Sequence, residues 1–264
     1  MERIVLAYSG SLASSVAIPW LREQHQVEVV TVTVDLGQHE SLEGIRVRAL
    51  ASGAARAHVL DRRDVFARHH LLPAVQDGAA DIDSDEALAS LALPLIAHAL
   101  VEIAQIEGAR IVAHAAEGDS DRARIGAAVT AIDAHMQVID VTDVWHMTDA
   151  AVADYARAHG IPLATPAAVP AAPSALGVPP VNDAALRVAI SFRAGVPAKI
   201  NGVEMDLVEL LTSLDTIAAS QGVAGNVVLG VAYRALQERV GAAAVTGAAT
   251  VNVLNGACEV VTNV

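Results

Sequence analysis

Aromatic residues, cysteine, basic side chains and long apolar runs are all scarce in this chain. Only 3% of its 264 residues are aromatic, and its single cysteine, Cys258, excludes an intramolecular disulfide. Lys and Arg total 17 against 30 Asp and Glu, and the resulting net charge of −13 disfavours nucleic acid as a partner because it repels phosphate. No uninterrupted apolar run approaches the roughly 18 residues of a membrane-spanning helix, and the first residues do not resemble a signal peptide. We therefore expect a soluble, cytoplasmic protein with no membrane partner.

Apolar residues, by contrast, are abundant and make up 53% of the chain. A folded chain of this length can bury on the order of 70% of its surface without disulfide or metal support. This excludes an intrinsically disordered chain. The length fits one large domain or two unequal ones.

From residue 3 to about residue 165, short β-branched runs alternate with longer segments of helical period. This alternation is typical of parallel βαβ units. The expected strands are 4–8, 27–34, 58–60, 110–114 and 138–141, and the expected helices end near residues 23 and 52, lie near residue 65, and span 90–107 and 148–159. The sequence thus predicts an α/β fold, a parallel twisted sheet with helices on both faces, whose ligands bind at the carboxyl ends of the strands.

Prolines interrupt the chain between Pro162 and Pro180, where neither a continuous helix nor a central strand is possible. We expect a nucleotide-binding α/β domain at 1–165, a Pro/Ala-rich linker at 166–183 and a smaller α+β oligomerisation domain at 184–264. The elements expected in the last are strands at 186–192 and 197–200, a tight turn at Asn201-Gly202, helices at 206–220 and 226–240, and a hairpin turning at Asn255-Gly256.

Apolar stripes on the two helices of this smaller domain predict further packing. The stripes include Leu207, Leu210 and Leu214 on the first helix, and Val228 and Leu236 on the second. A domain this small is not expected to cover both stripes by itself, so we expect a homo-oligomer, a dimer or a tetramer. The alternative is that the stripes pack on the α/β domain.

The most informative stretch, residues 5–16, reads as a strand, a loop of small residues and the start of a helix. Main-chain N–H groups in such a loop converge on one point, and the helix N-terminus adds partial positive charge, so a phosphate can bind there. The alternative is an ordinary turn with a serine N-cap. The nucleotide-binding candidates of this stretch are Ala7, Tyr8, Ser9, Gly10, Ser11, Ser14 and Ser15.

This loop and its surroundings resemble the argininosuccinate synthase family of N-type ATP pyrophosphatases. The matching segments, in order, are Leu6-Ala7-Tyr8-Ser9-Gly10, Thr33-Val34-Asp35-Leu36-Gly37-Gln38, Ser90-Leu91-Ala92, Val112-Ala113-His114, His159-Gly160-Ile161-Pro162 and Gly195-Val196-Pro197. The resemblance implies a HUP (Rossmann-like) fold, a tetramer, and ATP or AMP as ligand, with Mg²⁺ as a companion of ATP. The family reaction is the AMP-forming ligation of citrulline and aspartate. The resemblance also implies nucleotide-binding roles for Thr33, Val34, His114 and Gly118, and substrate-binding roles for Ser90, Asp121 and Arg124.

The chain departs from the family pattern where the chemistry would take place. The Asp of the family loop is Ala13 here and its second Gly is Ser11, while the family's substrate-facing Tyr, Thr and Arg correspond to Asp85, Ala89 and Leu93. The family's second glycine loop corresponds to the acidic residues 117–121, and its long insert has no counterpart. We therefore expect a divergent, shortened adenine-nucleotide-binding homologue with no assigned catalytic residue. Its ligation is lost or directed to another amino acid or amine; the alternative is a non-catalytic structural or regulatory homologue.

Other patterns indicate no further chemistry. Asp81-Ile82-Asp83-Ser84-Asp85 begins like a calcium loop but lacks the glycine and glutamate that complete one, so we interpret it as a solvated acidic loop. The histidines show no zinc-ligand spacing, and we expect no metal site. His114 could serve as a base for a Ser9 or Ser11 nucleophile, but a structural histidine at a strand end is the favoured interpretation.

Overall fold

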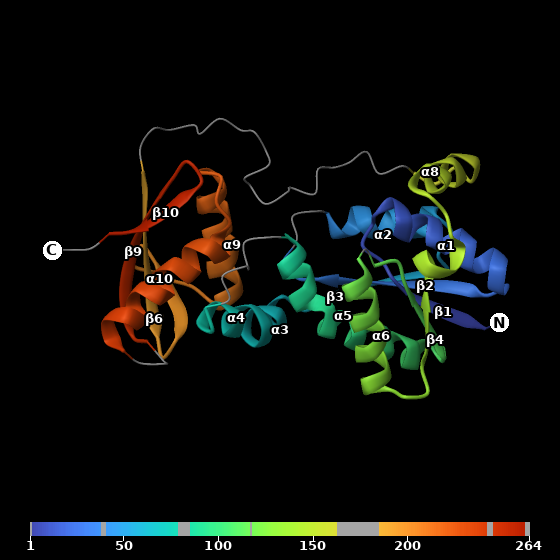
Figure 1. The fold of residues 1–264 in the computed structure, drawn as a ribbon, viewed down its shortest axis with the longest axis horizontal. Helices are drawn as coiled ribbons and strands as arrows, with labels where there is room; N and C mark the ends of the chain where they lie inside the picture. The colour runs from blue at the N-terminus through green and yellow to red at the C-terminus, as the bar shows by residue number, and fades with distance from the viewer. Residues whose placement is uncertain are drawn as a thin grey trace. The chain divides into compact units, whose positions relative to one another are not determined.

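The computed structural model describes residues 2–37, 41–78, 85–116, 118–162, 185–241 and 245–261 (Figure 1). The chain divides into two compact units: Met1–Arg62 with Ala92–Val169, and Arg63–Leu91 with Pro170–Val264. Residues 63–91, which the sequence analysis assigned to the first domain, thus belong by their contacts to the second unit. The expected linker at 166–183 lies outside the described residues.

A parallel five-stranded sheet forms the centre of the first unit, in the order β3-β2-β1-β4-β5. Its strands are β1 (Arg3–Ala7), β2 (Glu28–Asp35), β3 (Arg56–Asp61), β4 (Ile111–His114) and β5 (Gln137–Asp140). The chain builds outward from β1 on one side through β2 and β3, and on the other through β4 and β5. The strand order therefore reverses between β1 and β4, and the crevice outside their carboxyl ends is where sheets of this kind bind ligands.

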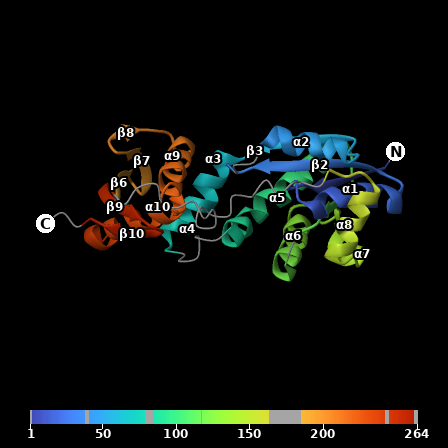
Figure 2. The same ribbon diagram turned by 90° about the horizontal axis from the view of Figure 1, so that it is seen from above.

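Helices cover both faces of this sheet (Figures 1 and 2), because successive strand residues point to opposite sides and both sides are apolar. The helices α1 (Leu12–His25), α2 (Leu42–Ala51) and α7 (Val141–Trp145) pack on one face. The helices α5 (Asp85–Glu107) and α6 (Asp119–Ile132) pack on the other, and α8 (Asp149–Ala158) packs on α1. The predicted α/β fold is confirmed, with α6 and α7 as helices that the sequence analysis did not predict.

Helix α5 is long and apolar. Its segment Ala87–Glu107 has a mean hydropathy of 1.9 and could span a membrane by length and composition alone. Half of the window is buried in the protein, and Leu93, Leu100 and Ile103 lie in the core beneath the sheet. A core helix of an α/β unit meets the same criterion, and it accounts for the apolar composition here.

The second unit is built on an antiparallel sheet in the order β10-β9-β6-β7-β8. Its strands are β6 (Leu186–Arg193), β7 (Val196–Ile200), β8 (Val203–Glu204), β9 (Gly247–Leu254) and β10 (Ala257–Val260). Its helices are α3 (Arg63–Phe66), the π-helix η1 (Ala67–Leu71), α4 (Leu72–Gln76), α9 (Leu207–Ala219) and α10 (Gly225–Val240). Both predicted Asn-Gly turns are confirmed: Asn201, Gly202, Asn255 and Gly256 all have positive φ, as two-residue hairpin turns require.

The apolar stripes of α9 and α10 are buried within this second unit. On α9, Leu210 and Leu214 are fully buried, and on α10 so are Leu229, Tyr233 and Leu236, to within 1% exposure. The ring of Tyr233 meets Phe192 of β6 edge to face at 5.6 Å. The stripes are covered by one face of the antiparallel sheet and by the short helices α3, η1 and α4, which contact α9 and α10. The segment 184–264 therefore does not cover both stripes by itself; residues 63–76 of the same chain complete the cover.

Candidate functional site

The loop between β1 and α1 lies at the point where the strand order reverses. Its Gly10 has φ +81°, and a Cβ on it would lie 2.6 Å from Nη2 of Arg48, so glycine is required there. Ser11 instead has φ −64° and ψ 163° as the N-cap of α1. A side chain is therefore unstrained at the position where the family carries its second glycine.

The loop presents main-chain donors to an anion. The N–H of Ser14 is bonded to Ser11 Oγ at 3.2 Å, and the N–H of Ser15 to Ser11 O at 3.0 Å. Among the residues that the structure describes, the N–H groups of Gly10, Leu12 and Ala13 have no hydrogen-bond partner. These groups stand at the positive end of the α1 dipole, so the loop can accept a phosphate.

Most of the predicted hydroxyl ligands hold the loop together instead. Ser14 and Ser15 are 2% and 1% exposed, and both hydroxyls donate to the carbonyl of Ser11, at 3.0 and 2.8 Å. The Ser15 oxygen lies 2.9 Å from the buried Tyr8 hydroxyl. Ser9 differs from these residues because it is exposed. Its Oγ lies 3.4 Å from Ser14 Oγ and accepts from the N–H of Ser11 at 3.4 Å. Its hydroxyl is the one in this group that faces solvent.

The end of β2 borders the same crevice. The Thr33 hydroxyl donates to the carbonyl of Tyr8 at 2.9 Å and is buried, and the Val34 side chain packs in the core with α5. Neighbouring Asp35 is 7% exposed and accepts from the N–H of Gly37 at 2.9 Å. The side chains of Thr33 and Val34 are thus structural, and any adenine contact at this strand end would come from the main chain.

His114, the last residue of β4, lies buried on the other side of β1. Its Nδ1 is 3.5 Å from the N–H of Ala116, so the proton of the neutral ring is assigned to Nε2. Burial lowers the pKa of His114, with Asp140 opposing this shift and Arg122 adding to it. The ring is therefore neutral at pH 7. No hydrogen bond joins it to Ser9 or Ser11 in the described residues, which leaves a serine nucleophile without its base.

The sequence analysis missed the group of charged and polar residues around His114. Arg122 of α6 lies 3.5 Å from the Asp140 carboxylate and donates to the hydroxyl of Thr142 at 3.1 Å. Asp140 in turn caps α7 by accepting from Thr142 and Asp143 N–H groups. An N-cap at Asp140 could have been predicted from the sequence. The ion pair between Asp140 and Arg122 could not, because it depends on how α6 packs on the sheet.

The predicted substrate-binding residues are not all brought together. Asp121 and Arg124 lie one turn apart on α6 and form an ion pair at 3.7 Å, near the exposed N-cap Gly118. Ser90 lies in the part of α5 that groups with the second unit. Leu93, where the family carries an arginine, is 5% exposed and belongs to the core.

Arg48 is a further residue at the loop that the sequence analysis missed. It projects from α2, and its guanidinium lies against Gly10, as does Ile45 one turn earlier. The helical spacing of Ile45 and Arg48 was visible in the sequence. Their contact with Gly10 was not visible, because it joins segments nearly 40 residues apart in the sequence.

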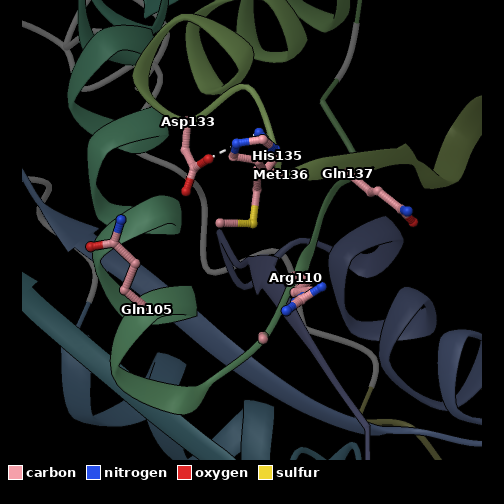
Figure 3. Close-up of a pocket in the computed structure, with 7 residues that line it drawn as sticks. Gln105, Arg110, Asp133, His135, Met136 and Gln137 are labelled. Carbon is pink, nitrogen blue, oxygen red and sulfur yellow. Dashed lines mark hydrogen bonds between the residues drawn. The ribbon is translucent and has the colours of Figure 1, made fainter.

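A hollow of about 490 Å³ lies at the opposite edge of the sheet (Figure 3). Its lining includes Arg110 and Gln137, at the amino ends of β4 and β5, and the loop residues Asp133, His135 and Met136. It is therefore separate from the crevice at the carboxyl ends. In the described part of the chain, no group of three or more His, Cys, Asp or Glu side chains could hold a metal ion. The acidic stretch 81–84 and Glu117 lie outside that part.

Comparisons with known proteins agree with this architecture. A family model described as the arginosuccinate synthase N-terminal HUP domain matches residues 3–162. Curated argininosuccinate synthases from Moorella thermoacetica, Oceanobacillus iheyensis and Caldanaerobacter subterraneus are 35%, 33% and 34% identical to this chain. Each alignment covers 84% of this chain and 62%, 60% and 61% of the relative, respectively, so the chain spans about three fifths of their length. The chain belongs to the argininosuccinate synthase family.

Proposed function

We propose that the first unit binds an adenine nucleotide, ATP or AMP, at the carboxyl ends of β1 and β4. The observation that carries the proposal is the set of N–H groups of Gly10, Leu12 and Ala13 at the N-terminus of α1. Oriented N–H groups at a helix start are a general phosphate-binding device. The family uses ATP, which supports adenine as the base.

The residues at the loop fit a nucleotide better than they fit a bound magnesium ion. Mg²⁺ in nucleotide sites is held by carboxylates together with the phosphates. The loop offers Ala13 where the family offers its Asp, so the phosphates would be held by the main-chain donors and the Ser9 hydroxyl. ATP bound there would supply the phosphoanhydride bond that the family reaction breaks, whereas AMP, which has no such bond, would bind as the product.

We further propose that ligation of citrulline and aspartate is lost or directed to another amino acid or amine. Leu93 is a core residue in place of a carboxylate-binding arginine, and Asp121 neutralises Arg124. Groups that stabilise a transition state act as one constellation, so the surviving serines are not expected to replace them. The names of the relatives support the ligase family over the alternative of a structural or regulatory homologue.

Calorimetric titration of the whole chain with ATP and with AMP tests nucleotide binding. We expect saturable binding at one site, weakened about tenfold or more by Gly10→Ala, because the added Cβ strains the loop and displaces Arg48. The matched control is Gly126→Ala on α6, where a Cβ meets nothing within 4 Å. Equal affinity in both variants, or no binding by the wild type, would contradict the proposal.

A pyrophosphate-release assay with ATP, citrulline and aspartate tests the loss of ligation. We expect no argininosuccinate and no pyrophosphate above background, and Ala13→Asp alone should not restore either. Turnover of about 0.1 per second or faster would be within ordinary enzymatic range and would refute the loss. A cytoplasmic location and the absence of nucleic-acid and membrane partners stay predictions.

A further inference from the structure

We propose that the hollow at the amino ends of β4 and β5 is a binding site for a free amino acid whose own side chain is uncharged. Arg110 binds the carboxylate of this ligand, and Asp133 binds its ammonium group. The hollow is separate from the crevice at the carboxyl ends of the strands, so the inference does not rest on the proposed nucleotide binding.

Two neighbouring turns form the walls of the hollow. The first turn leads from Gln105, near the end of α5, to Arg110 at the start of β4. The second leads from Asp133, at the end of α6, to Gln137, the first residue of β5. The turns are neighbours because β4 and β5 pair in parallel, and the N–H of Gln137 donates to the carbonyl of Arg110 at 2.9 Å. In Figure 3 the side chains of Asp133 and Met136 extend from the second turn toward the first.

Hydrogen bonds within each turn fix the shape of these walls. In the first turn, the N–H of Ala109 donates to the carbonyl of Ala104 at 2.8 Å. In the second, the N–H of Met136 donates to the carbonyl of Asp133 at 3.1 Å, and the N–H of His135 donates to the Asp133 carboxylate at 2.9 Å. The hollow is therefore preformed. Its volume of about 490 Å³ lies within the range of small-molecule sites, roughly 300–1,000 Å³.

Two opposite charges line the hollow without pairing with each other. Among the residues that the structure describes, neither the guanidinium of Arg110 nor the carboxylate of Asp133 forms an ion pair. One oxygen of Asp133 accepts from the N–H of His135, which leaves the other oxygen for a ligand. Because each charge belongs to a different turn, a ligand with one charge of each sign can pair with both. Such charge-assisted hydrogen bonds are roughly twice as strong as those between neutral groups.

The rest of the lining favours a ligand whose side chain is uncharged. Ala109 and Met136 form a buried apolar floor, at 7% and 9% exposure. The carboxamide of Gln105 adds a neutral group that can both donate and accept. At about pH 8 an ordinary histidine ring is neutral, so the charges of Arg110 and Asp133 sum to zero. A third charge on the ligand would have no partner in the lining.

Calorimetric titration of the whole chain at about pH 8 tests the site, with L-glutamine and L-methionine as probes. We expect saturable binding of at least one probe, with a dissociation constant of about 1 mM or tighter. Analogues that lack one charged group should bind about tenfold more weakly or worse, because each loses one charge pair. They are 4-aminobutanamide and glutaramic acid for L-glutamine, and 3-(methylthio)propylamine and 4-(methylthio)butanoic acid for L-methionine.

Variants of the two charged residues form the second arm of the test. Arg110→Gln and Asp133→Asn should each weaken binding of the amino acid about tenfold or more. Asp133→Asn keeps an oxygen that can accept from the N–H of His135, so the turn is preserved. The matched control is Arg187→Gln, which removes the charge of an exposed arginine on β6 and should change the affinity by less than about twofold.

Three results would overturn the inference: no saturable binding of either probe, analogues that bind as tightly as the amino acid, or equal affinities in Arg110→Gln and Arg187→Gln. The analogue comparison uses the wild type alone, so it decides even if a variant fails to fold. Titration of ATP into the same proteins tests the proposed function separately. Arg110→Gln and Asp133→Asn should leave ATP affinity within about twofold of the wild type, because they lie at the opposite edge of the sheet.

Discussion

At the scale of single residues, the loop side chains mainly bond to one another, and the main chain is left to face a ligand. The hydroxyls of Tyr8, Ser14 and Ser15 form a buried set around the carbonyl of Ser11. The sequence identified the right stretch because strand, small-residue loop and helix start are local patterns. It could not show that these hydroxyls point inward, since their directions depend on how α1 packs on the sheet.

A second residue-scale feature lies at the amino ends of the strands, where Glu107 closes α5. Its side chain is 2% exposed and contacts Arg56, His58 Nε2 at 3.0 Å and Arg3 Nη1 at 3.3 Å. The hydrogen bond from Arg56 is the main cause that lowers the pKa of Glu107, with His58 adding to it against the effect of burial. This carboxylate therefore ties α5 to β1 and β3.

Glu107→Gln should lower the free energy of unfolding at pH 7 by about 1–3 kcal/mol, because a buried charge-assisted network loses its anion. Since the folded-state pKa is lowered, the stabilisation is present above the unfolded carboxyl pKa and is lost as pH falls through the folded value. The difference between wild type and variant should thus shrink below about pH 4.5. Urea unfolding at stepwise lower pH measures it. The control is Glu102→Gln, whose pair with Arg62 is half-exposed; an equal loss there would contradict the network.

At the scale of elements, the strands and hairpins were the most predictable parts. β-branched runs and the two Asn-Gly pairs are strong local signals, and the structure places strands and turns there. Helix α6 was missed because its apolar contribution to the core comes mainly from Ile125 and Val129, within a segment rich in Ala and charged residues. The grouping of α3, η1 and α4 with the second unit was missed for a different reason. These helices contact α9 and α10, which lie more than 100 residues away in the sequence.

The junction of α9 and α10 gives a prediction at this scale. Gly225 begins α10, and its N–H donates to Asp215 at 2.7 Å, while a Cβ on it would lie 2.6 Å from the main-chain nitrogen of Asp215. Gly225→Ala should destabilise the second unit by about 1–3 kcal/mol, since backbone atoms cannot yield as a flexible side chain can. Gly230→Ala, in open space on the same helix, should be neutral or stabilising by up to about 1 kcal/mol. Thermal unfolding of both variants tests this prediction. Equal melting temperatures would contradict the close packing of Gly225 against Asp215.

At the scale of the whole molecule, the prolines between residues 162 and 180 predict a boundary, but they give no sign that residues 63–91 group with the C-terminal segment. Such grouping depends on long-range contacts, for which a single sequence has no local signal. The predicted substrate-binding residues give a second example. The sequence analysis grouped Ser90, Asp121 and Arg124, but Ser90 belongs to the second unit and the other two belong to the first.

Oligomerisation stays a prediction, and its basis has changed. With the helix stripes buried, the candidates for contact are the second sheet face, where Ala189, Ser191 and Thr250 are partly exposed, and the exposed Val203 and Val260. Antiparallel sheets often leave such a face in water. We still expect a symmetric dimer or tetramer through the region after residue 200. Sedimentation equilibrium at micromolar concentration should give a multiple of 27.2 kDa, and a mass near the monomer value would reject it.

The central claim, that the crevice between β1 and β4 binds an adenine nucleotide, is tested most directly by a crystal structure of the chain grown with ATP or AMP. We predict density for phosphate at the N–H groups of Gly10, Leu12 and Ala13, and for adenine near Ala7, Thr33 and Val34. A nucleotide seated in the C-terminal unit, beyond the proline segment, or a crevice that stays without nucleotide at saturating concentration, would contradict the account.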